Sequence, residues 1–328
     1  MTTSDSFKQR GVALLSMLLV FAIVATLTGS MLYKNRLEIK GFQTLLRSAQ
    51  AVEYARGGIV LAELWLQRYR NPEKAGMSVF QPPEGDLAVY ISDEMGKFNL
   101  NNLRDKNGAV NAVQLAVLQR LFVALEIDPQ LAVAVADWVD ADISSSGSVN
   151  TEDLGYSNRP TIDGSGYRAA NQPVAHISEL LLVAGFSSQV VEKLKPYISA
   201  LPVTTGVNVN TASPLLLEAL MPGLQGQALV AARDRTASGF VDLDRFLTDQ
   251  SSAGVDIPAA LLTTVSNFYL VTSRGVYRDQ PALWQALIRR SNAEGADSSA
   301  VDLFWDTQTL WLQRLPFWSA ESSVDYYE

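Results

Sequence analysis

The organisation of this chain is decided by residues 10–32, which read RGVALLSMLLVFAIVATLTGSML. The last 21 of these residues, 12–32, contain no charged side chain. As an α-helix they rise about 31 Å, which matches the ~30 Å hydrocarbon core of a bilayer. No other stretch of the sequence is long and apolar enough to cross a membrane. The sequence therefore predicts a single membrane-spanning helix at residues 12–32.

The order of residues around Gly11 separates this segment from an ordinary secretory signal. Such a signal has an apolar region of about 7–15 residues followed by small residues at the cleavage site. Here the small residue Gly11 comes before the apolar run. Arg10-Gly11-Val12 resembles a type IV prepilin leader, which implies that prepilin peptidase cleaves between Gly11 and Val12 and leaves the helix attached. A simple signal anchor is the alternative interpretation.

The helical pattern continues beyond the apolar run. Asn71-Pro72 is the expected end, because proline disfavours helix in the residue before it. A helix of roughly 55 residues would be about 80 Å long, so its first half must lie in a membrane or a polymer. A pair of helices broken near Gly57-Gly58 is the alternative. The apolar residues that recur at helical spacing are Leu45, Ala49, Val52, Ile59, Ala62, Trp65, Leu66 and Tyr69.

Strand patterns lie on both sides of a long helical region. Residues 87–91 and 98–101 read as strands, residues 111–263 are predominantly helical, and strand patterns return at 268–272, 282–288 and 310–314. This order predicts an α+β protein in which a small antiparallel sheet is interrupted by an inserted helical domain. The expected divisions are a leader at 1–11, a membrane helix at 12–32, a first part of helix and strands at 33–103, the insert at 104–264, and final strands at 265–328.

Composition excludes several classes of site. The 328 residues include no cysteine and one histidine, which leaves no disulfide and no thiolate zinc site. That histidine, His176, precedes an apolar helix and is expected to be a turn or core residue. No nucleophile elbow or P-loop motif is present, so we expect no catalytic residues and no enzyme. The net charge of −8 disfavours binding to nucleic acid.

Acidic residues gather around one loop. Asp140 and Asp142 lie at a predicted helix end, and Glu152 and Asp153 follow a loop rich in serine and glycine. Calcium takes six to eight oxygen ligands at about 2.3–2.6 Å, and such a loop offers several carboxylates. The spacing is not that of an EF-hand, because Thr151 stands where the final glutamate belongs. From spacing alone, a solvated acidic loop and a metal site are equally good interpretations.

Residues 207–233 resemble a helix-hairpin-helix. In the versions that bind DNA, amide groups of the hairpin hold a phosphate and basic residues lie nearby. No lysine occurs between residues 206 and 250, so a membrane-anchored DNA-binding or DNA-uptake protein that uses this module is the disfavoured alternative. Asparagines alternate with other residues at 98–102 and at 207–211, ahead of a helical pair in both cases. We interpret them as structural hydrogen-bonding residues.

Taken together, the chain resembles the K-type minor pseudopilins of the bacterial type II secretion system. The resemblance spans nearly the whole length and rests on residues 10–15, 96–102, 137–142, 167–180 and 207–213. It implies a type IV pilin-like fold with a large inserted α-domain.

The resemblance also implies partners and a location. The expected partners are the I-type and J-type minor pseudopilins, which share the pseudopilus tip, together with the inner-membrane secretion platform. The expected location is the bacterial inner membrane, crossed once, with the globular part in the periplasm. Calcium in the α-domain is implied as well, and the matching positions are Asp140, Asp142, Glu152, Asp153 and Asn171.

One position departs from the general pilin pattern. Counted from Val12, the fifth residue is Ser16, where most pilins carry a glutamate thought to neutralise the terminal amine of a neighbouring subunit. An unpaired carboxylate in an apolar filament core would be costly. A subunit with no neighbour above it has no such amine to neutralise, so Ser16 fits a tip position.

Overall fold

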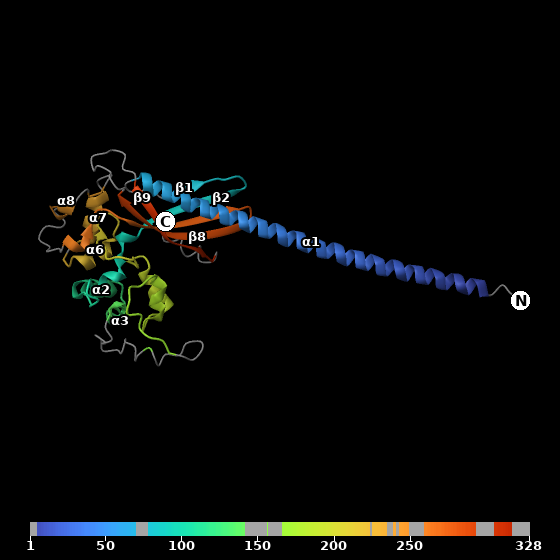
Figure 1. Ribbon diagram of the computed structural model, residues 1–328, viewed down its shortest axis with the longest axis horizontal. Coiled ribbons are helices and arrows are strands. Elements are labelled where there is room, and N and C mark those ends of the chain that lie inside the picture. Colours follow the sequence, from blue (N-terminus) through green and yellow to red (C-terminus); the bar gives the residue numbers. More distant parts are fainter. Residues whose placement is uncertain are drawn as a thin grey trace.

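The structure is a computed structural model that describes residues 5–69, 78–141, 156, 166–223, 225–234, 239–240, 243–248, 259–292 and 305–316. Its longest element is helix α1 (Asp5–Arg68), which comprises 64 residues and projects far beyond the rest of the molecule (Figure 1). The helix runs without a break through Gly57 and Gly58, so the alternative of two separate helices is wrong. The expected end at Asn71-Pro72 lies outside the described residues.

The last part of α1 packs on a five-stranded antiparallel sheet. The strand order is β1-β2-β7-β8-β9. These strands are β1 (Ser78–Phe80), β2 (Gly85–Asp93), β7 (Phe268–Tyr277), β8 (Gln280–Asn292) and β9 (Trp305–Leu315). The predicted strands at 87–91, 268–272, 282–288 and 310–314 all fall within this sheet, although each observed strand is longer. The predicted fold class, a long helix on a small antiparallel sheet with helices inserted, is confirmed.

The contact between α1 and the sheet follows from two periodicities. Buried side chains alternate along β2, as expected for a strand with one face on a core. On α1 the buried residues recur every three or four positions, which places them on one side of the helix. The buried side chains of this contact include Ala55, Ile59, Ala62, Leu66, Leu87, Val89, Ile91, Tyr269, Val271 and Ile288.

Glycines bring the helix backbone and the sheet backbone close together. A Cβ added to Gly275 of β7 would lie 2.5 Å from the backbone nitrogen of Ala55 and 2.6 Å from the carbonyl oxygen of Ala51. A Cβ added to Gly58 would lie 2.1 Å from Oγ of Ser273. A larger residue at position 275 would meet the backbone of α1 and push the helix away from the sheet, whereas one at position 58 would meet side-chain atoms of the sheet, Ser273 Oγ first.

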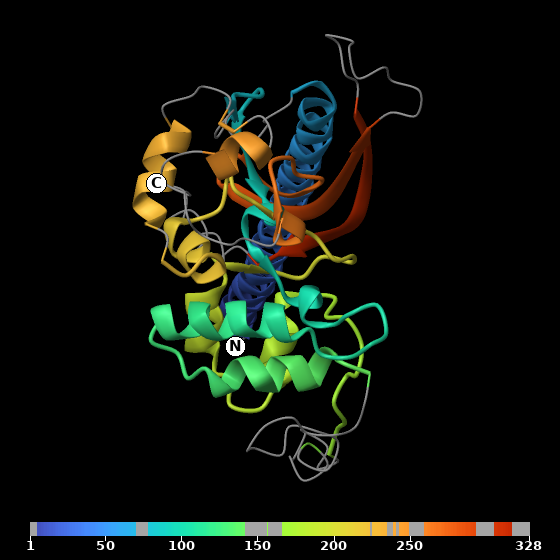
Figure 2. The same cartoon turned by 90° about the vertical axis from the view of Figure 1, so that its left-hand side faces the viewer.

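The elements between β2 and β7 form a separate helical part. It lies at the end of the sheet opposite to the projecting helix (Figures 1 and 2). Its α-helices are α2 (Ala112–Ala124), α3 (Gln130–Val139), α5 (Ser188–Leu194), α6 (Pro214–Leu220), α7 (Gly226–Asp234) and α8 (Leu243–Thr248). Its 3-10 helices are η2 (Glu94–Gly96), η3 (Leu100–Leu103), η4 (Ile177–Leu182) and η5 (Ala259–Leu261). It has its own apolar core, distinct from the one between α1 and the sheet.

The helical part also contains two short pairs of parallel strands, each of which joins segments distant in the sequence. β3 (Phe98–Asn99) pairs with β4 (Ile198–Ser199), and β5 (Val207–Asn208) pairs with β6 (Leu262–Thr263). The strand predicted at 98–101 is therefore wrong in extent, because η3 begins at Leu100 and the strand belongs to the helical part. The segment predicted as a helix at 178–185 is instead the 3-10 helix η4, preceded by a cap at His176.

Candidate metal site and assembly elements

The end of α3 carries the first of the predicted calcium ligands. Asp140 is the C-terminal cap of this helix, and its backbone N–H donates to the carbonyl oxygen of Ala136 at 3.0 Å. Asp140 is only 1% exposed. The C-terminal end of a helix carries a partial negative charge, which together with a buried carboxylate favours a cation.

Asn171 lies against the same helix end. Its backbone N–H donates to the carbonyl oxygen of Trp138 at 3.0 Å. Its φ of 48° is in the left-handed region, and its Oδ1 atom is buried with no hydrogen-bond donor among the described residues. A buried amide oxygen without a donor is suited to a hard cation. The structure thus brings Asn171 next to the segment that ends in Asp140.

The other predicted ligands cannot be placed in the same way. Asp142, Glu152 and Asp153 lie outside the described residues. Within the part of the chain that the structure describes, no group of three or more acidic or histidine side chains could hold a metal ion. Of the candidate metal site, the structure therefore describes the Asp140 carboxylate, the Asn171 amide oxygen and the C-terminal end of α3.

Arg104 adds a positive charge at this helix end. Its guanidinium Nη1 donates to the carbonyl oxygens of Val139, at 3.0 Å, and Asn171, at 3.1 Å. These two hydrogen bonds hold the irregular segment around Asn171 against the end of α3. They use main-chain carbonyls and do not engage the Asn171 side-chain oxygen.

An aromatic cluster stands beside the same helix end. The ring centroids of Trp138 and Tyr156 are 5.2 Å apart, and those of Tyr156 and Tyr167 are also 5.2 Å apart. The Tyr156 hydroxyl accepts a hydrogen bond from the backbone N–H of Ala184 at 3.1 Å. Trp138 is two residues before Asp140 in the chain, so the indole and phenol rings of this cluster belong to the same end of α3 as the candidate metal ligand.

The asparagines of residues 98–102 have the structural role that the sequence predicted. Nδ2 of Asn101 donates to the carbonyl oxygens of Val174, at 2.9 Å, and Leu201, at 2.7 Å. Its Oδ1 accepts from the backbone N–H of Val174 at 2.7 Å. Oδ1 of Asn99 accepts from the backbone N–H of Leu201 at 3.0 Å. These amides satisfy main-chain groups of two irregular segments, around Val174 and Leu201, that no helix or strand completes.

Sequence reasoning missed the residue that joins the sheet to the helical part. The Asp93 carboxylate lies at the end of β2, and its Oδ2 accepts from Asn208 Nδ2 at 2.9 Å, Thr211 Oγ1 at 2.5 Å and Ser266 Oγ at 2.5 Å. Its Oδ1 accepts from the backbone N–H of Met95 at 2.8 Å. The only signal in the sequence was the turn pattern at 93–97, which gave no reason to expect long-range partners.

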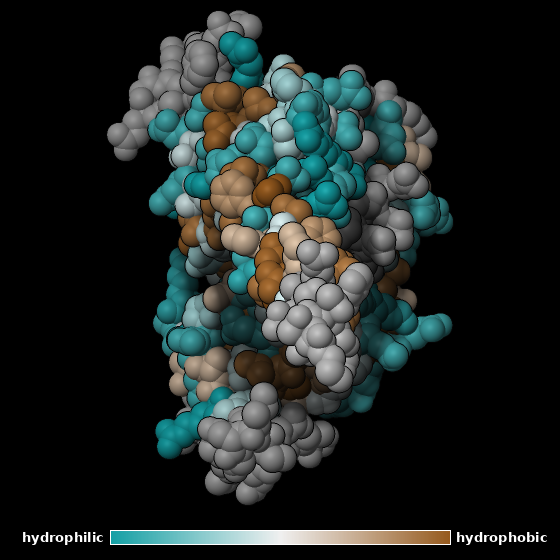
Figure 3. All heavy atoms as spheres, turned by 90° about the vertical axis from the view of Figure 1, so that its right-hand side faces the viewer, coloured by the Kyte–Doolittle hydropathy of each residue, from teal (hydrophilic) through white to brown (hydrophobic). Residues whose placement is uncertain are grey.

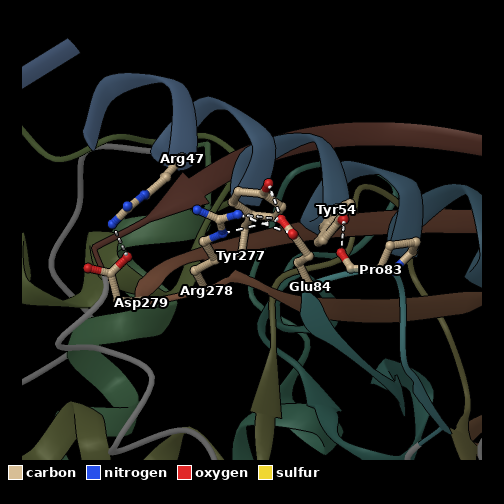
Figure 4. Close-up of polar contacts among 7 residues, drawn as sticks. All are labelled: Arg47, Tyr54, Pro83, Glu84, Tyr277, Arg278 and Asp279. Atoms are coloured by element: carbon tan, nitrogen blue, oxygen red, sulfur yellow. Dashed lines mark hydrogen bonds and ion pairs between the residues drawn. The ribbon is translucent and has the colours of Figure 1, made fainter. Parts of the chain in front are cut away.

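Polar contacts also hold α1 where it leaves the sheet (Figure 4). The Arg47 guanidinium lies 3.2 Å from Oδ1 of Asp279 in the turn between β7 and β8. The Arg278 guanidinium contacts both carboxylate oxygens of Glu84, at 3.1 and 2.9 Å. Hydrogen bonds from Arg278, and next from Tyr277, lower the pKa of Glu84 below its usual value of 4.5. Arg47 therefore marks the start of the packed part of the helix.

The hairpin between α6 and α7 differs from a DNA-binding one in a specific contact. The backbone N–H of Gly226, at the start of α7, donates to Oε1 of Glu218 at 3.0 Å. A carboxylate of the same chain thus binds an amide of the kind that holds a phosphate in DNA-binding hairpins. Gly226 also packs tightly, because an added Cβ would lie 2.3 Å from the carbonyl oxygen of Pro214.

The single histidine caps a short helix. Nδ1 of His176 accepts a hydrogen bond from the backbone N–H of Ser178 at 3.2 Å, and the Glu179 carboxylate accepts from the His176 backbone N–H at 3.1 Å. The imidazole meets Trp311 of β9 edge-on, with 6.0 Å between ring centroids. The predicted role of a turn residue is therefore confirmed.

The projecting part of α1 has the properties of a membrane anchor. It is the one helix of the described residues that is long and apolar enough to cross a membrane. Its side chains from 14 to 46 are exposed, Ser16 among them. Seen from the side on which α1 projects, hydrophobic side chains gather along the foreshortened helix, and the surface around it is largely hydrophilic (Figure 3). Gly11 and Val12 lie within the helix, and cleavage between them stays a prediction.

Comparison with known proteins decides the family. Two family profiles, both described as "Type II secretion system (T2SS), protein K", match residues 96–203 and 207–266. A curated relative from Pseudomonas aeruginosa, type II secretion system protein K, is 34% identical over 75% of this chain and 78% of its own length. The chain belongs to the protein K family of the type II secretion system.

Other members and a solved structure agree with this. Protein K of Klebsiella pneumoniae is 31% identical over 77% of this chain and 83% of its own length. The crystal structure of the GspK-GspI-GspJ complex from enterotoxigenic Escherichia coli contains a chain that matches with a TM-score of 0.66 and 27% identity. That match covers 86% of this chain and 99% of the crystallised one. Protein K is a structural component of a secretion system, so the DNA-uptake alternative is not favoured.

Proposed function

We propose that this chain is a minor pseudopilin that forms the tip complex of the periplasmic pseudopilus with I-type and J-type minor pseudopilins, and so supports assembly of the filament for protein export. The observation that carries the proposal is the match to the crystallised GspK chain, which extends over 86% of this sequence and 99% of that chain. GspK was crystallised with GspI and GspJ. The proposal assigns no enzymatic activity to the chain.

The shape of the molecule suggests how it would act at a tip. The helical part lies at the far end of the sheet from the projecting helix (Figure 1). In a filament whose subunits stack along their N-terminal helices, this part would occupy the space above the subunit and block the addition of another. Ser16 supports the same position, because a tip subunit has no amine above it that a carboxylate would neutralise.

Assembly would begin in the inner membrane. The helix at 12–32 would hold the chain there with the globular part in the periplasm. Prepilin peptidase would remove residues 1–11, and the inner-membrane secretion platform would then move the chain into the filament. Burial of the exposed apolar side chains of α1 against partner helices would supply the driving force for that step.

The experiment is co-expression of the full chain with its I-type and J-type partners, with and without prepilin peptidase, followed by intact mass measurement and affinity purification. We expect loss of residues 1–11, a chain that begins at Val12, and co-purification of both partners. An uncleaved chain that captures neither partner would refute the proposal. Catalytically inactive peptidase is the matched control for the mass change.

We also propose that calcium binds at the end of α3 as a structural ion. Asp140, Asp142, Glu152, Asp153 and Asn171 would supply the oxygen ligands. Two observations support this: the buried Asp140 carboxylate at a helix C-terminus, and the Asn171 amide oxygen that is buried without a described donor. An ion there would tie the acidic loop to α3 and contribute its binding free energy to folding.

The aromatic cluster provides a direct assay for this ion. Terbium replaces calcium at oxygen sites, and its luminescence is sensitised by a nearby indole or phenol ring. We expect excitation at 280 nm to produce terbium emission that calcium suppresses, and calcium to raise the melting temperature. Asp140→Asn should abolish both effects, whereas Asp86→Asn, at an exposed site on β2, should leave them unchanged. Equal emission from both variants would exclude this site.

A further inference from the structure

The charges of this chain are divided unevenly along α1. Residues 1–40 hold five basic and two acidic side chains, which leaves 21 basic and 32 acidic side chains in residues 41–328. Residues 41–328, which comprise the globular part and the piece of α1 that leads into it, therefore carry a net charge of −11. Between them and the apolar run lie Lys34, Arg36 and Lys40, interrupted by a single acid, Glu38. We call these three basic residues the basic flank.

The basic flank is exposed and available. The side chains of residues 33–40 are all exposed in the structure. Within the residues that the structure describes, none of the three cations forms an ion pair with a carboxylate. Tyr33, Arg36 and Lys40 are three and four residues apart, so they lie on one side of the helix. Arg36 and Lys40 thus form a positive stripe without an ion pair among the described residues, with Tyr33 at its membrane end, and Lys34 adds a third positive charge on another side of the helix.

The position of the flank relative to the bilayer follows from the length of the helix. If residues 12–32 cross the ~30 Å hydrocarbon core, Tyr33 enters the interface and residues 34–40 occupy the next ~10 Å, where the headgroups lie. Tyrosine is enriched at that depth. The first contact of α1 with the sheet, at Arg47, is seven residues above Lys40, or about 10 Å along the axis.

The basic flank would lie on the periplasmic side of the membrane, opposite to the side on which basic residues are usually in excess. Lysine and arginine are normally in excess on the cytoplasmic side of a membrane helix. Here, cleavage after Gly11 would remove Lys8 and Arg10 and leave only the terminal amine on that side. Meanwhile an acidic globular part would stand about one Debye length above the membrane and be repelled by anionic lipid. A positive stripe between the two offsets this repulsion.

We propose that the basic flank binds the phosphate headgroups of anionic phospholipids in the periplasmic leaflet and thereby holds the subunit in the membrane before assembly. The proposal rests on the membrane anchoring in the proposed function. Each basic residue near an anionic surface contributes about a fivefold preference. We therefore expect the three residues together to raise the ratio of anionic to neutral lipid beside the helix, relative to the same ratio in the bulk membrane, by at least about tenfold.

The test uses the full chain in nanodiscs of phosphatidylcholine with 0, 25 or 50% phosphatidylglycerol. Lipids that stay with the protein are counted by native mass spectrometry at low and high salt. We expect phosphatidylglycerol to be enriched over its bulk fraction, less so at high salt, and the K34Q/R36Q/K40Q variant to retain lipid at the bulk ratio. E38Q is the matched control from the same segment, and it should increase the enrichment. Wild-type enrichment in the triple variant would overturn the proposal.

Two further results separate this proposal from the anchoring on which it rests. Release of the chain from membranes by alkaline carbonate would overturn both. Carbonate resistance with a lipid shell of bulk composition would overturn only the lipid contact. If the triple variant instead keeps its lipid shell but fails to co-purify with the I-type and J-type partners, the flank belongs to a protein contact and the lipid assignment is wrong.

Discussion

Replacing Arg290 with methionine should detach the end of α1 from the sheet. Arg290 of β8 is 1% exposed, and its guanidinium donates to the carbonyl oxygens of Tyr69, at 2.8 Å, and Ser266, at 3.2 Å, and to the Tyr269 hydroxyl at 2.8 Å. It also lies 4.3 Å from the ring centroid of Trp305. The Arg290 guanidinium therefore links three parts of the chain: Tyr69, which follows α1, the beginning of β7 with the residues just before it, and Trp305 of β9.

The magnitude follows from what the substitution leaves behind. Methionine keeps most of the stem, but the two carbonyl oxygens remain in place without this donor, at about 1–3 kcal/mol each. Loss of a desolvated cation–π contact adds about 1–2 kcal/mol. Relief of the cost of burying a charge offsets part of this sum. We expect a net loss of about 2–4 kcal/mol in the free energy of unfolding.

Arg289 offers a matched control, because it is the neighbouring residue of β8 and its side chain is exposed. Denaturant unfolding of Arg290→Met and Arg289→Met in detergent measures the difference, and Arg289→Met should stay within about 0.5 kcal/mol of wild type. Hydrogen exchange should accelerate in the last turn of α1 and in β8, but not in α2 or α3. Equal stability of the two variants would show that the buried guanidinium does not hold the helix end.

Three further predictions concern the sheet and its junction. Gly275→Ala should destabilise the protein by about 1–3 kcal/mol through overpacking against α1, whereas Gly57→Ala, with no atom within 4 Å of its added Cβ, should stabilise the helix by about 0.5–1 kcal/mol; thermal melts of both variants test this. Asp93→Ala should leave three side-chain donors without their shared acceptor and make the junction susceptible to limited proteolysis at lower protease concentration. Because the pKa of Glu84 is lowered in the folded state, its stabilising effect is present at neutral pH and is lost as the pH falls through that lowered value. A carbon-13 NMR titration should place the Glu84 midpoint below 4.5, and a Glu84 midpoint at or above 4.5 would contradict the contact with Arg278.

Periodic patterns in the sequence were sufficient for the fold class. The uncharged run at 12–32 and the helical spacing from Leu45 onward predicted a helix too long for one globule, and strand patterns on both sides of a helical region predicted an insertion. Each of these signals is local and repeats over many residues. The η4 region was harder, because a short apolar stretch after a cap does not distinguish an α-helix from a 3-10 helix.

Contacts between distant segments were beyond the reach of sequence reasoning. Asp93 finds its partners 115 and 173 residues away at Asn208 and Ser266, and nothing in a turn pattern specifies such pairs. The close approach of Gly275 to α1 is equally invisible, since it depends on the packing of a strand against a helix. Of the candidate metal ligands, the sequence identified the helix end at Asp140, but only the structure shows that the Asn171 main chain meets it.

The register between β2 and β7 shows where the helical part was placed in the pilin sheet. Asp93 pairs with Tyr269, so the two strands are antiparallel neighbours whose ends lie together, as in an ordinary hairpin. The residues between the two strands, 94–267, therefore occupy the position of a hairpin turn. Extra sequence at a turn leaves the ladder on both sides in register, and the entropy of closing a loop grows only slowly with its length. A whole domain can therefore stand at this turn without altering the strand pairing that the sheet needs in order to fold.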